Sequence, residues 1–329
     1  MGRLIRLAAC LPLGLALCIP SSGIVHARRT VPVTVAMGYV ANIQFAPFYV
    51  AQAKGYYRQA GLDVRFRYGI EPDLLRLASL GKVDFVNSGG DEVLAAGAHG
   101  LGVKYVLTQY TRFPSAVFWL QRTGIRRLRD LRGRTVGIPG PFGASYVGLL
   151  ALLRRAGIPQ SSLKIESIGF NQVASVAGGK VDAAVGYAMN EPVFLRHQGL
   201  RVGEFDIFHW VNIAGAGIAV GNGEIARRPA TVRAFVRATI RGMDDTLRNP
   251  DEAFRITLRV VPKLRAQSRV QRAILQRSLD FWRPEPGHPL GWIDPLVWNR
   301  TARLLYAFKQ IPRPVSAASY YTNRFTRRP

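Results

Sequence analysis

Two short segments of this chain repeat one another about a hundred positions apart. The first runs from Leu80 to Val86 and reads LGKVDFV, and the second runs from Gly178 to Val185 and reads GGKVDAAV. Each is typical of a helix that ends at glycine, followed by a polar turn and a short buried strand. Open α/β sheets bind ligands at the carboxyl ends of their parallel strands. Although each motif alone is ordinary turn chemistry, the repeat predicts two similar lobes that meet over a small molecule.

Strand-like and helix-like segments alternate along the chain, which predicts parallel sheets covered by helices. We expect strands at 31–37, 62–68, 83–86, 103–109, 116–120, 135–138, 163–167, 181–185 and 213–220, and the segment 205–210 closes the second unit. We expect helices at 46–60, 72–80, 92–98, 128–131, 144–156, 171–177, 191–198, 229–247, 251–260, 268–281 and 294–308.

The order of these segments predicts two crossings between lobes, near 115–122 and near 211–219. Lobe 1 would then comprise residues 28–117 and 213–329, and lobe 2 residues 118–212. Two crossings make a hinge on which the lobes can close. A single large α/β domain with a helical extension is the alternative.

The first 27 residues have the composition of an export signal. Arg3 and Arg6 precede an apolar run at 7–20 that is too short to span a bilayer comfortably. Residues 25–27 read Val-His-Ala, a cleavage pattern, so we expect cleavage after Ala27 and export to the periplasm. An uncleaved anchor, or lipidation at Cys10 or Cys18, is the alternative.

Cysteine content and charge narrow the function further. Cys10 and Cys18 are the only cysteines, so the mature chain would hold no disulfide, zinc–thiolate site or thiol nucleophile. The histidines have no metal-ligand spacing, and we expect neither metal nor cofactor. The net charge of +25 comes from singly scattered basic residues, which indicates a solvated basic surface and no nucleic-acid site. That charge could still favour an anionic ligand or an acidic membrane surface.

Several motifs, in order and spacing, resemble a family of periplasmic solute-binding proteins. They are NIQFAPFYVA at 42–51, KGYY at 54–57, GLDV at 61–64, GKVD at 81–84 and at 179–182, LRGRTVG at 131–137 and YYTNRF at 320–325. The resemblance is to receptors for nitrate, alkylsulfonates, thiamine-pyrimidine precursors and riboflavin, and it spans nearly the whole mature chain. It implies the type II periplasmic-binding-protein fold, with two hinged α/β lobes. It also implies a monomer that delivers a small-molecule ligand to an ABC permease at the inner membrane.

The same family includes a thiamine pyrimidine synthase that uses pyridoxal phosphate on a lysine, a nearby histidine and a cysteine-rich iron motif. The lysine and histidine would fall where this chain has Ser88 and Glu92, and the cysteines near 214–217, which reads AGAG. Without an amine no Schiff base can form there. The resemblance therefore implies a binding protein that is not an enzyme, with the synthase as an alternative.

Aromatic and polar residues gather at the expected loop positions. Aromatic pairs stack on flat heterocycles, at about 1–3 kcal/mol per ring, while carboxylates and amides bind ring edges. The candidate ligand-binding residues are Tyr39, Asn42, Phe45, Ser88, Asp91, Glu92, Tyr110, Arg112, Phe113, Phe142, Ser145, Tyr146, Tyr187, Asn190 and Glu191, with Gln44 as a polar neighbour. Arg112 would pair with a phosphate or carboxylate of the ligand.

Several candidates have a structural alternative. Asn42 and Ser145 could each cap a helix, and Glu191 could be a first-turn acid favoured by the helix dipole. Ser88 could be a turn residue, and Asp84 and Asp182 could each be turn or strand-end residues. Arg112 could be an exposed hinge residue.

The segments at 42–50 and 140–146 look most like the riboflavin- and pyrimidine-binding branch of the family. We therefore expect a receptor for a flat aromatic vitamin or precursor. A nitrate or alkylsulfonate receptor is the first alternative, since a buried anion would need a small site rich in charge-assisted donors. A sensor module that does not serve transport is another.

Overall fold

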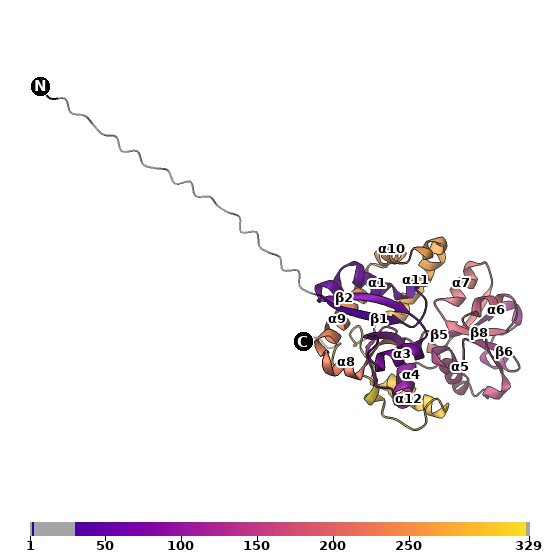
Figure 1. Ribbon diagram of the computed structural model, residues 1–329. Coiled ribbons are helices and arrows are strands. Elements are labelled where there is room, and N and C mark those ends of the chain that lie inside the picture. Colours follow the sequence, from indigo (N-terminus) through magenta and orange to yellow (C-terminus); the bar gives the residue numbers. More distant parts are fainter. Residues whose placement is uncertain (1, 3–29, 327–329) are drawn as a thin grey trace.

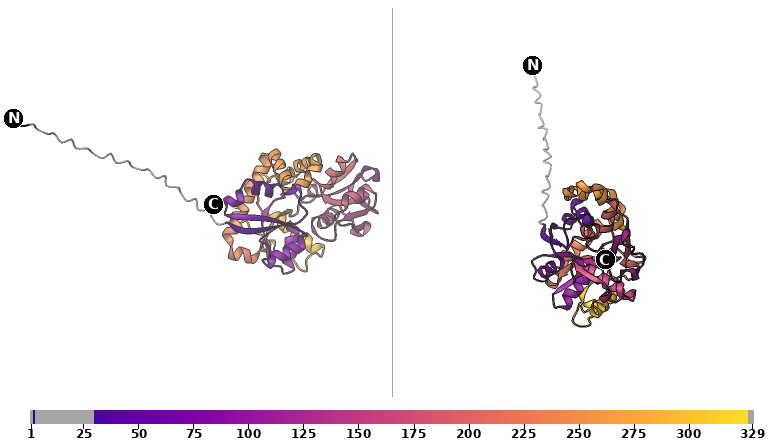
Figure 2. Two further views of the ribbon diagram at one scale, coloured as in Figure 1. Left: turned by 45° about the horizontal axis from the view of Figure 1, so that its top comes forward. Right: turned by 90° about the vertical axis from the view of Figure 1, so that its right-hand side faces the viewer.

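The computed structural model describes residues 30–326, together with Gly2. The expected export signal, its cleavage site and the lipidation alternatives lie outside the described residues, Gly2 apart. Between residues 30 and 326 the chain forms two α/β lobes, each built on a five-stranded sheet (Figures 1 and 2). The two expected α/β lobes are therefore confirmed.

The first sheet has the strand order β2-β1-β3-β10-β4. Its strands are β1 (Val31–Met37), β2 (Leu62–Tyr68), β3 (Phe85–Gly89), β4 (Val103–Thr108) and β10 (Ala216–Gly221). Successive strand residues point to opposite faces, so Phe85 enters one core and Val86 the other.

Helices cover both faces of this sheet (Figure 1). The core on one face includes α1 (Ala46–Ala53), α2 (Tyr56–Gln59), α9 (Pro229–Arg248), α10 (Pro250–Val260) and α11 (Ser268–Trp282). The core on the other face includes α3 (Glu71–Ser79), α4 (Gly90–Ala98) and α12 (Pro295–Ala307), and α8 (Asn222–Arg227) follows β10.

The second sheet has the order β7-β6-β8-β5-β9. Its strands are β5 (Ser115–Leu120), β6 (Thr135–Ile138), β7 (Lys164–Ser167), β8 (Ala183–Tyr187) and β9 (Val202–Asp206). One face packs on α5 (Gly143–Arg155), and the other on α6 (Gln172–Ala177) and α7 (Glu191–His197). Short 3-10 helices lie at Ile43–Phe45, Gln121–Thr123, Leu128–Leu131, Gln160–Ser162, Ile207–His209, Pro262–Gln267 and Ala317–Tyr320.

The sequence repeat forms the same local structure in both lobes. The Asp84 carboxylate accepts a hydrogen bond from the Thr34 amide of β1 at 2.7 Å, and the Asp182 carboxylate accepts one from the Thr135 amide of β6 at 2.8 Å. Gly81 has a φ of 69°, which favours glycine, and its counterpart Gly179 has a φ of 71°. Asp84 and Asp182 are thus strand-end residues in equivalent positions, as their structural alternative predicted.

Two expectations about local structure are wrong. The sheets are mixed, since β10 and β5 each run antiparallel to both neighbours; each is the first strand after a crossing. The helix expected at 46–60 breaks at Gly55, whose φ is 72°. The segment expected to close the second unit, 205–210, holds the end of β9, which pairs with β5, and a 3-10 helix at Ile207–His209.

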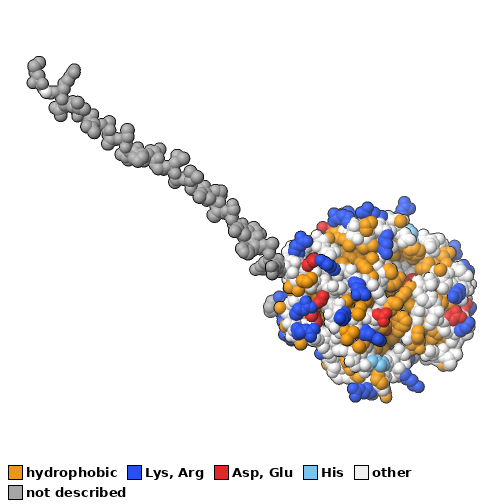
Figure 3. All heavy atoms as spheres, in the orientation of Figure 1, with side chains coloured by type: hydrophobic (Ala, Val, Ile, Leu, Met, Phe, Trp, Pro, Cys, Tyr) orange, Lys and Arg blue, Asp and Glu red, His pale blue; other side chains and the backbone are white. Residues whose placement is uncertain are grey.

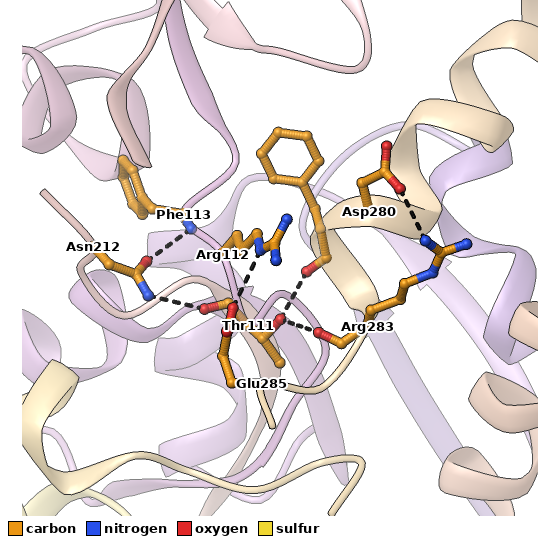
Figure 4. A network of polar contacts seen from close by, with 8 residues as sticks. Thr111, Arg112, Phe113, Asn212, Asp280, Arg283 and Glu285 are labelled. Atoms are coloured by element: carbon orange, nitrogen blue, oxygen red, sulfur yellow. Dashed lines mark hydrogen bonds and ion pairs between the residues drawn. The ribbon is translucent and has the colours of Figure 1, made fainter. Parts of the chain in front are cut away.

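The chain passes between the sheets at 109–114 and returns at 210–215. The boundary expected at 117 falls inside β5, which pairs in the second sheet along its length, so the first crossing lies a few residues earlier. Asn212 joins the two crossings: its Oδ1 accepts from the Phe113 amide at 3.0 Å, and its Nδ2 donates to the Thr111 carbonyl at 3.1 Å (Figure 4).

A cluster of ion pairs joins the lobes beside this hinge. Arg277 of α11 in the first lobe lies 2.6 Å from Glu204 and 3.0 Å from Asp206, both on β9 in the second lobe. Its Nε also donates to the Ala188 carbonyl at 3.0 Å. The two carboxylates are largely shielded from solvent, and although Glu204 also pairs with Arg196 of its own lobe at 3.2 Å, Arg277 ties both carboxylates to the first lobe.

We predict that Arg277→Ala lowers the free energy of unfolding by about 1–3 kcal/mol, the usual loss for hydrogen bonds to charged groups. The reason is that Glu204 and Asp206, both on β9, would lose the cation that they share with the first lobe, although Glu204 would keep its pair with Arg196. Chemical denaturation measures the change. Arg248→Ala, which removes an exposed pair with Asp244, is the control and should change little. Equal losses in the two variants would contradict the role of Arg277.

Candidate functional site

A cleft opens between the two lobes and encloses about 920 Å³, its open mouth included. Figure 3 shows apolar side chains gathered along the boundary between the lobes, with Lys and Arg side chains scattered around it. The lining residues are Gly38, Tyr39, Gln44, Phe45, Ile70, Glu71, Asn87, Glu92, Tyr110, Pro139, Phe142, Gly143, Ala144, Ser145, Phe170, Gln172, Gly186, Tyr187, Asn190, Glu191 and Ala216.

Both sheets direct the ends of their strands into this cleft. Tyr39, Glu71 and Asn87 follow or lie near the end of β1, β2 and β3, and Pro139, Phe170 and Tyr187 do the same for β6, β7 and β8. These are the carboxyl ends of parallel strands, as expected for open α/β sheets. We refer to this space as the inner compartment.

Aromatic side chains from both lobes face the inner compartment. Tyr39 of the first lobe and Phe170 of the second meet edge to face, with ring centroids 5.4 Å apart. Tyr110, in the first crossing, meets Tyr187 of β8 in the same way, at 5.9 Å. Phe142 precedes α5 and is 39% exposed, so its ring is available to a ligand. These rings give the inner compartment apolar aromatic surfaces from both lobes.

Glu71 brings a carboxyl group to the same space. Its Oε2 accepts hydrogen bonds from the Ser88 hydroxyl at 2.9 Å and from the Gly89 amide at 2.8 Å. Burial, and then the nearby Glu92 carboxylate, raise the pKa of Glu71 to about 7. Near neutral pH this side chain can therefore either donate or accept a hydrogen bond.

Two more carboxyl groups complete an acidic lining. Glu92 lies at the start of α4 and reaches across the lobes to the backbone of Gly143, where α5 begins, and burial raises its pKa. Glu191 accepts from the Tyr187 amide at 2.8 Å, and burial raises its pKa to about 6. Burial and Glu191 together raise the pKa of Tyr39 to about 12, which keeps that phenol protonated.

The lining is acidic although the protein is basic. Among the lining residues, all of which lie in the described part of the chain, three are glutamates and none is Lys, Arg or His. A buried anion needs charge-assisted donors, and these are missing here. The inner compartment therefore suits an uncharged or donor-bearing guest better than an anion.

Nine of the fifteen sequence candidates line the inner compartment. They are Tyr39, Phe45, Glu92, Tyr110, Phe142, Ser145, Tyr187, Asn190 and Glu191. Three others lie next to it: Asn42 caps the 3-10 helix at Ile43–Phe45, Ser88 supports Glu71, and Asp91 is buried beside the acidic side chains. Burial, and then Glu92 and Glu71, raise the pKa of Asp91 well above its usual value.

The last three candidates point away from the cleft. Arg112 pairs with Glu285 at 3.1 Å and lies over the Phe208 ring, so it belongs to the hinge shown in Figure 4. The ring of Phe113 is buried in the core against Gly148 of α5. Tyr146 packs on the outer side of α5, where its hydroxyl accepts from Gln160 at 3.4 Å.

Several lining residues were not among the sequence candidates, above all Glu71, Phe170 and Gln172. Glu71 begins α3 just after β2, and Phe170 precedes α6 just after β7. Both therefore follow strands that the sequence pattern had placed correctly. Applying the strand-end rule to every strand, edge strands included, would have found them.

Residues 30–326 also bear on metal binding and on membrane crossing. In this range no three His, Cys, Asp or Glu side chains are arranged to hold a metal ion. None of the helices in the same range combines the length and the apolar character that crossing a membrane requires.

Comparison with known proteins agrees with this architecture. The alkanesulfonate-binding protein SsuA of Xanthomonas axonopodis pv. citri, solved with MOPS bound, matches with a TM-score of 0.71 and 16% identity, over 88% of this chain and 98% of that one. The chain therefore has the periplasmic-binding-protein fold. The sequence profile described as NMT1/THI5 like matches residues 42–253. The chain belongs to the NMT1/THI5-like family, which confirms the family resemblance found in the sequence.

Two sequence relatives differ in what they do. The riboflavin-binding protein RibY of Chloroflexus aurantiacus is 44% identical over 299 residues, which is 89% of this chain and 85% of that protein. A 4-amino-5-hydroxymethyl-2-methylpyrimidine phosphate synthase of Legionella pneumophila is 29% identical over 89% of this chain and 92% of its own length. Together with the fold, the more similar of these two relatives supports a solute-binding role.

The raised carboxyl pKa values predict that stability falls as the pH rises. The folded protein keeps the Glu71 proton up to a pH of about 7, whereas the ordinary pKa is 4.5, so the folded state binds more protons between these values. Glu191 likewise keeps its proton in the folded protein up to a pH of about 6. The melting temperature of the parent protein should therefore fall between pH 5 and pH 8. In the double variant Glu71→Gln with Glu191→Gln, we expect this fall to be smaller by about 2–4 °C.

Thermal unfolding at the two pH values measures this effect. Asp73→Asn, on the exposed face of α3, is the matched control and should leave the pH dependence unchanged. An unchanged slope in the double glutamine variant would contradict the burial of these two carboxylates.

Proposed function

We propose that this protein is an extracytoplasmic receptor that binds a flat, uncharged heterocycle of the riboflavin type in the inner compartment. The observation that carries the proposal is the combination of aromatic walls from both lobes with three glutamates and no cationic side chain among the lining residues. The guest would lie between the rings, and closure of the lobes on the hinge would retain it. No covalent chemistry is required.

Hydrogen bonding at the ring edge supports this class of guest. A flavin ring carries one N–H donor and several carbonyl and ring-nitrogen acceptors along its polar edge. An ionised glutamate can accept from the N–H, while a protonated Glu71 can donate to an acceptor, because its pKa is about 7. Asn190 also lines the compartment, and its amide can do both, whereas the amide nitrogen of Asn87 already donates to Gln109 and to the Gly217 carbonyl.

The likeness to RibY supports riboflavin as the first ligand to test. A thiamine-pyrimidine precursor is the second, because its small ring is also flat and rich in donors. The expected export signal and the fold are consistent with capture in the periplasm and delivery to an ABC permease, with the receptor acting as a monomer.

Two alternatives fit the site less well. A nitrate or alkylsulfonate receptor would place its anion among Glu71, Glu92 and Glu191, where like charge repels it. A pyrimidine synthase of the family type would need an amine near Ser88, but that hydroxyl is buried and already donates to Glu71. A binding role therefore agrees best with the site.

We predict that Phe142→Ala weakens riboflavin binding by about 10- to 100-fold, because one stacked ring contributes about 1–3 kcal/mol. Quenching of flavin fluorescence on titration with refolded, ligand-free protein measures the affinity. Tyr306→Ala, an exposed aromatic on α12 far along the chain from the lining residues, is the control and should bind as the parent does. Heat from taurine or nitrate in calorimetry, with none from riboflavin or formylated aminopyrimidine, would overturn the ligand class.

A further inference from the structure

The cleft does not end at the inner compartment. A second hollow of about 1,070 Å³, its open mouth included, adjoins it and shares five lining residues with it. They are Tyr39, Phe170, Gln172, Asn190 and Glu191. The edge-to-face pair of Tyr39 and Phe170 thus lines both spaces. We call the second space the outer compartment.

The outer compartment differs in chemistry from the inner one. Amide side chains line it from both lobes: Asn42 and Gln271 from the first, Gln172 and Asn190 from the second, with Gln267 at its exposed edge. A primary amide both donates and accepts hydrogen bonds, so it pairs well with a ligand group, such as a hydroxyl, that also donates and accepts. Three aromatic residues line the outer compartment, Tyr39, Phe170 and Phe194, whereas six line the inner one.

Among the residues of the outer compartment, Gln271 most clearly indicates a binding site. It lies on α11, is 4% exposed, and its Oε1 accepts no hydrogen bond from any described residue. A buried polar atom without a partner lowers stability by about 1–3 kcal/mol. Sites that bind a hydroxyl or N–H group commonly hold such acceptors ready, because a bound donor removes the penalty.

We propose that the outer compartment binds a flexible, hydroxyl-rich and uncharged chain attached to the ring that occupies the inner compartment. Hydroxyl groups donate and accept at once, which matches the amide lining. Lys263 is the only cation among the outer lining residues and lies exposed, and the buried Glu191 lines the same hollow, so the compartment as a whole does not select an anionic tail. The proposal rests on the proposed function, since it needs the ring in the inner compartment.

Two flavins separate the contributions of ring and chain. Riboflavin carries a polyhydroxyl chain, whereas lumiflavin has the same ring with a methyl group in its place. We expect riboflavin to bind about tenfold more tightly than lumiflavin, a difference of about 1.4 kcal/mol. Fluorescence titration of the full chain with each flavin measures both affinities.

Variants then assign the difference to the outer compartment. Gln271→Met nearly conserves volume but removes the amide, and should weaken riboflavin about five- to tenfold while leaving lumiflavin within about twofold. Gln267→Ala, at an exposed position that cannot disturb the core, should act in the same direction by about twofold. Gln121→Met, exposed and outside both compartments, is the matched control and should change neither affinity.

Each outcome bears on a different claim. Equal affinities for riboflavin and lumiflavin in the parent, or equal losses for both flavins in Gln271→Met and Gln267→Ala, would overturn the outer compartment as a chain site. Tighter binding of the phosphorylated flavin FMN would overturn the uncharged chain and make Lys263 a phosphate partner. If neither flavin binds at all, the proposed function fails and this inference fails with it.

Discussion

Two crossings of the chain between the sheets determine how the rest of this molecule is arranged. Because the chain leaves the first sheet at 109–114 and returns at 210–215, the carboxyl ends of both sets of parallel strands face one cleft. Asn212 joins the crossings to each other, and Arg277 joins the lobes beside them. The strands that follow each crossing are the antiparallel ones, so the same constraint explains the mixed sheets.

The charge of the cleft is opposite to that of the protein. A net charge of +25 alone would suggest an anionic ligand, yet the inner compartment contains Glu71, Glu92 and Glu191 and no cation among its lining residues. Burial raises the pKa values of all three carboxyl groups, and that of Glu71, about 7, lets it donate as well as accept a hydrogen bond near neutral pH. The positive charge is scattered over the surface, whereas the acidic side chains are concentrated at the site. The charge at the site therefore decides which ligand fits.

The sequence predicted the two lobes, most elements and nine lining residues, because glycine stops, buried strands and strand ends are local patterns. Tyr187 was found in this way, at the end of the buried strand β8. Glu71 and Phe170 were missed because they follow edge strands that no repeat marked. The directions of Phe113 and Tyr146 were wrong, since they depend on how α5 packs against the hinge at Gly148, which is a tertiary contact without a local signal.

A crystal structure of the protein with riboflavin tests the central claim most directly. The account predicts the flavin ring inside the inner compartment, between aromatic side chains of the two lobes, with its polar edge at the glutamates and its chain in the outer compartment. A flavin bound elsewhere on the surface, or a ring whose polar edge faces away from Glu71, Glu92 and Glu191, would contradict it.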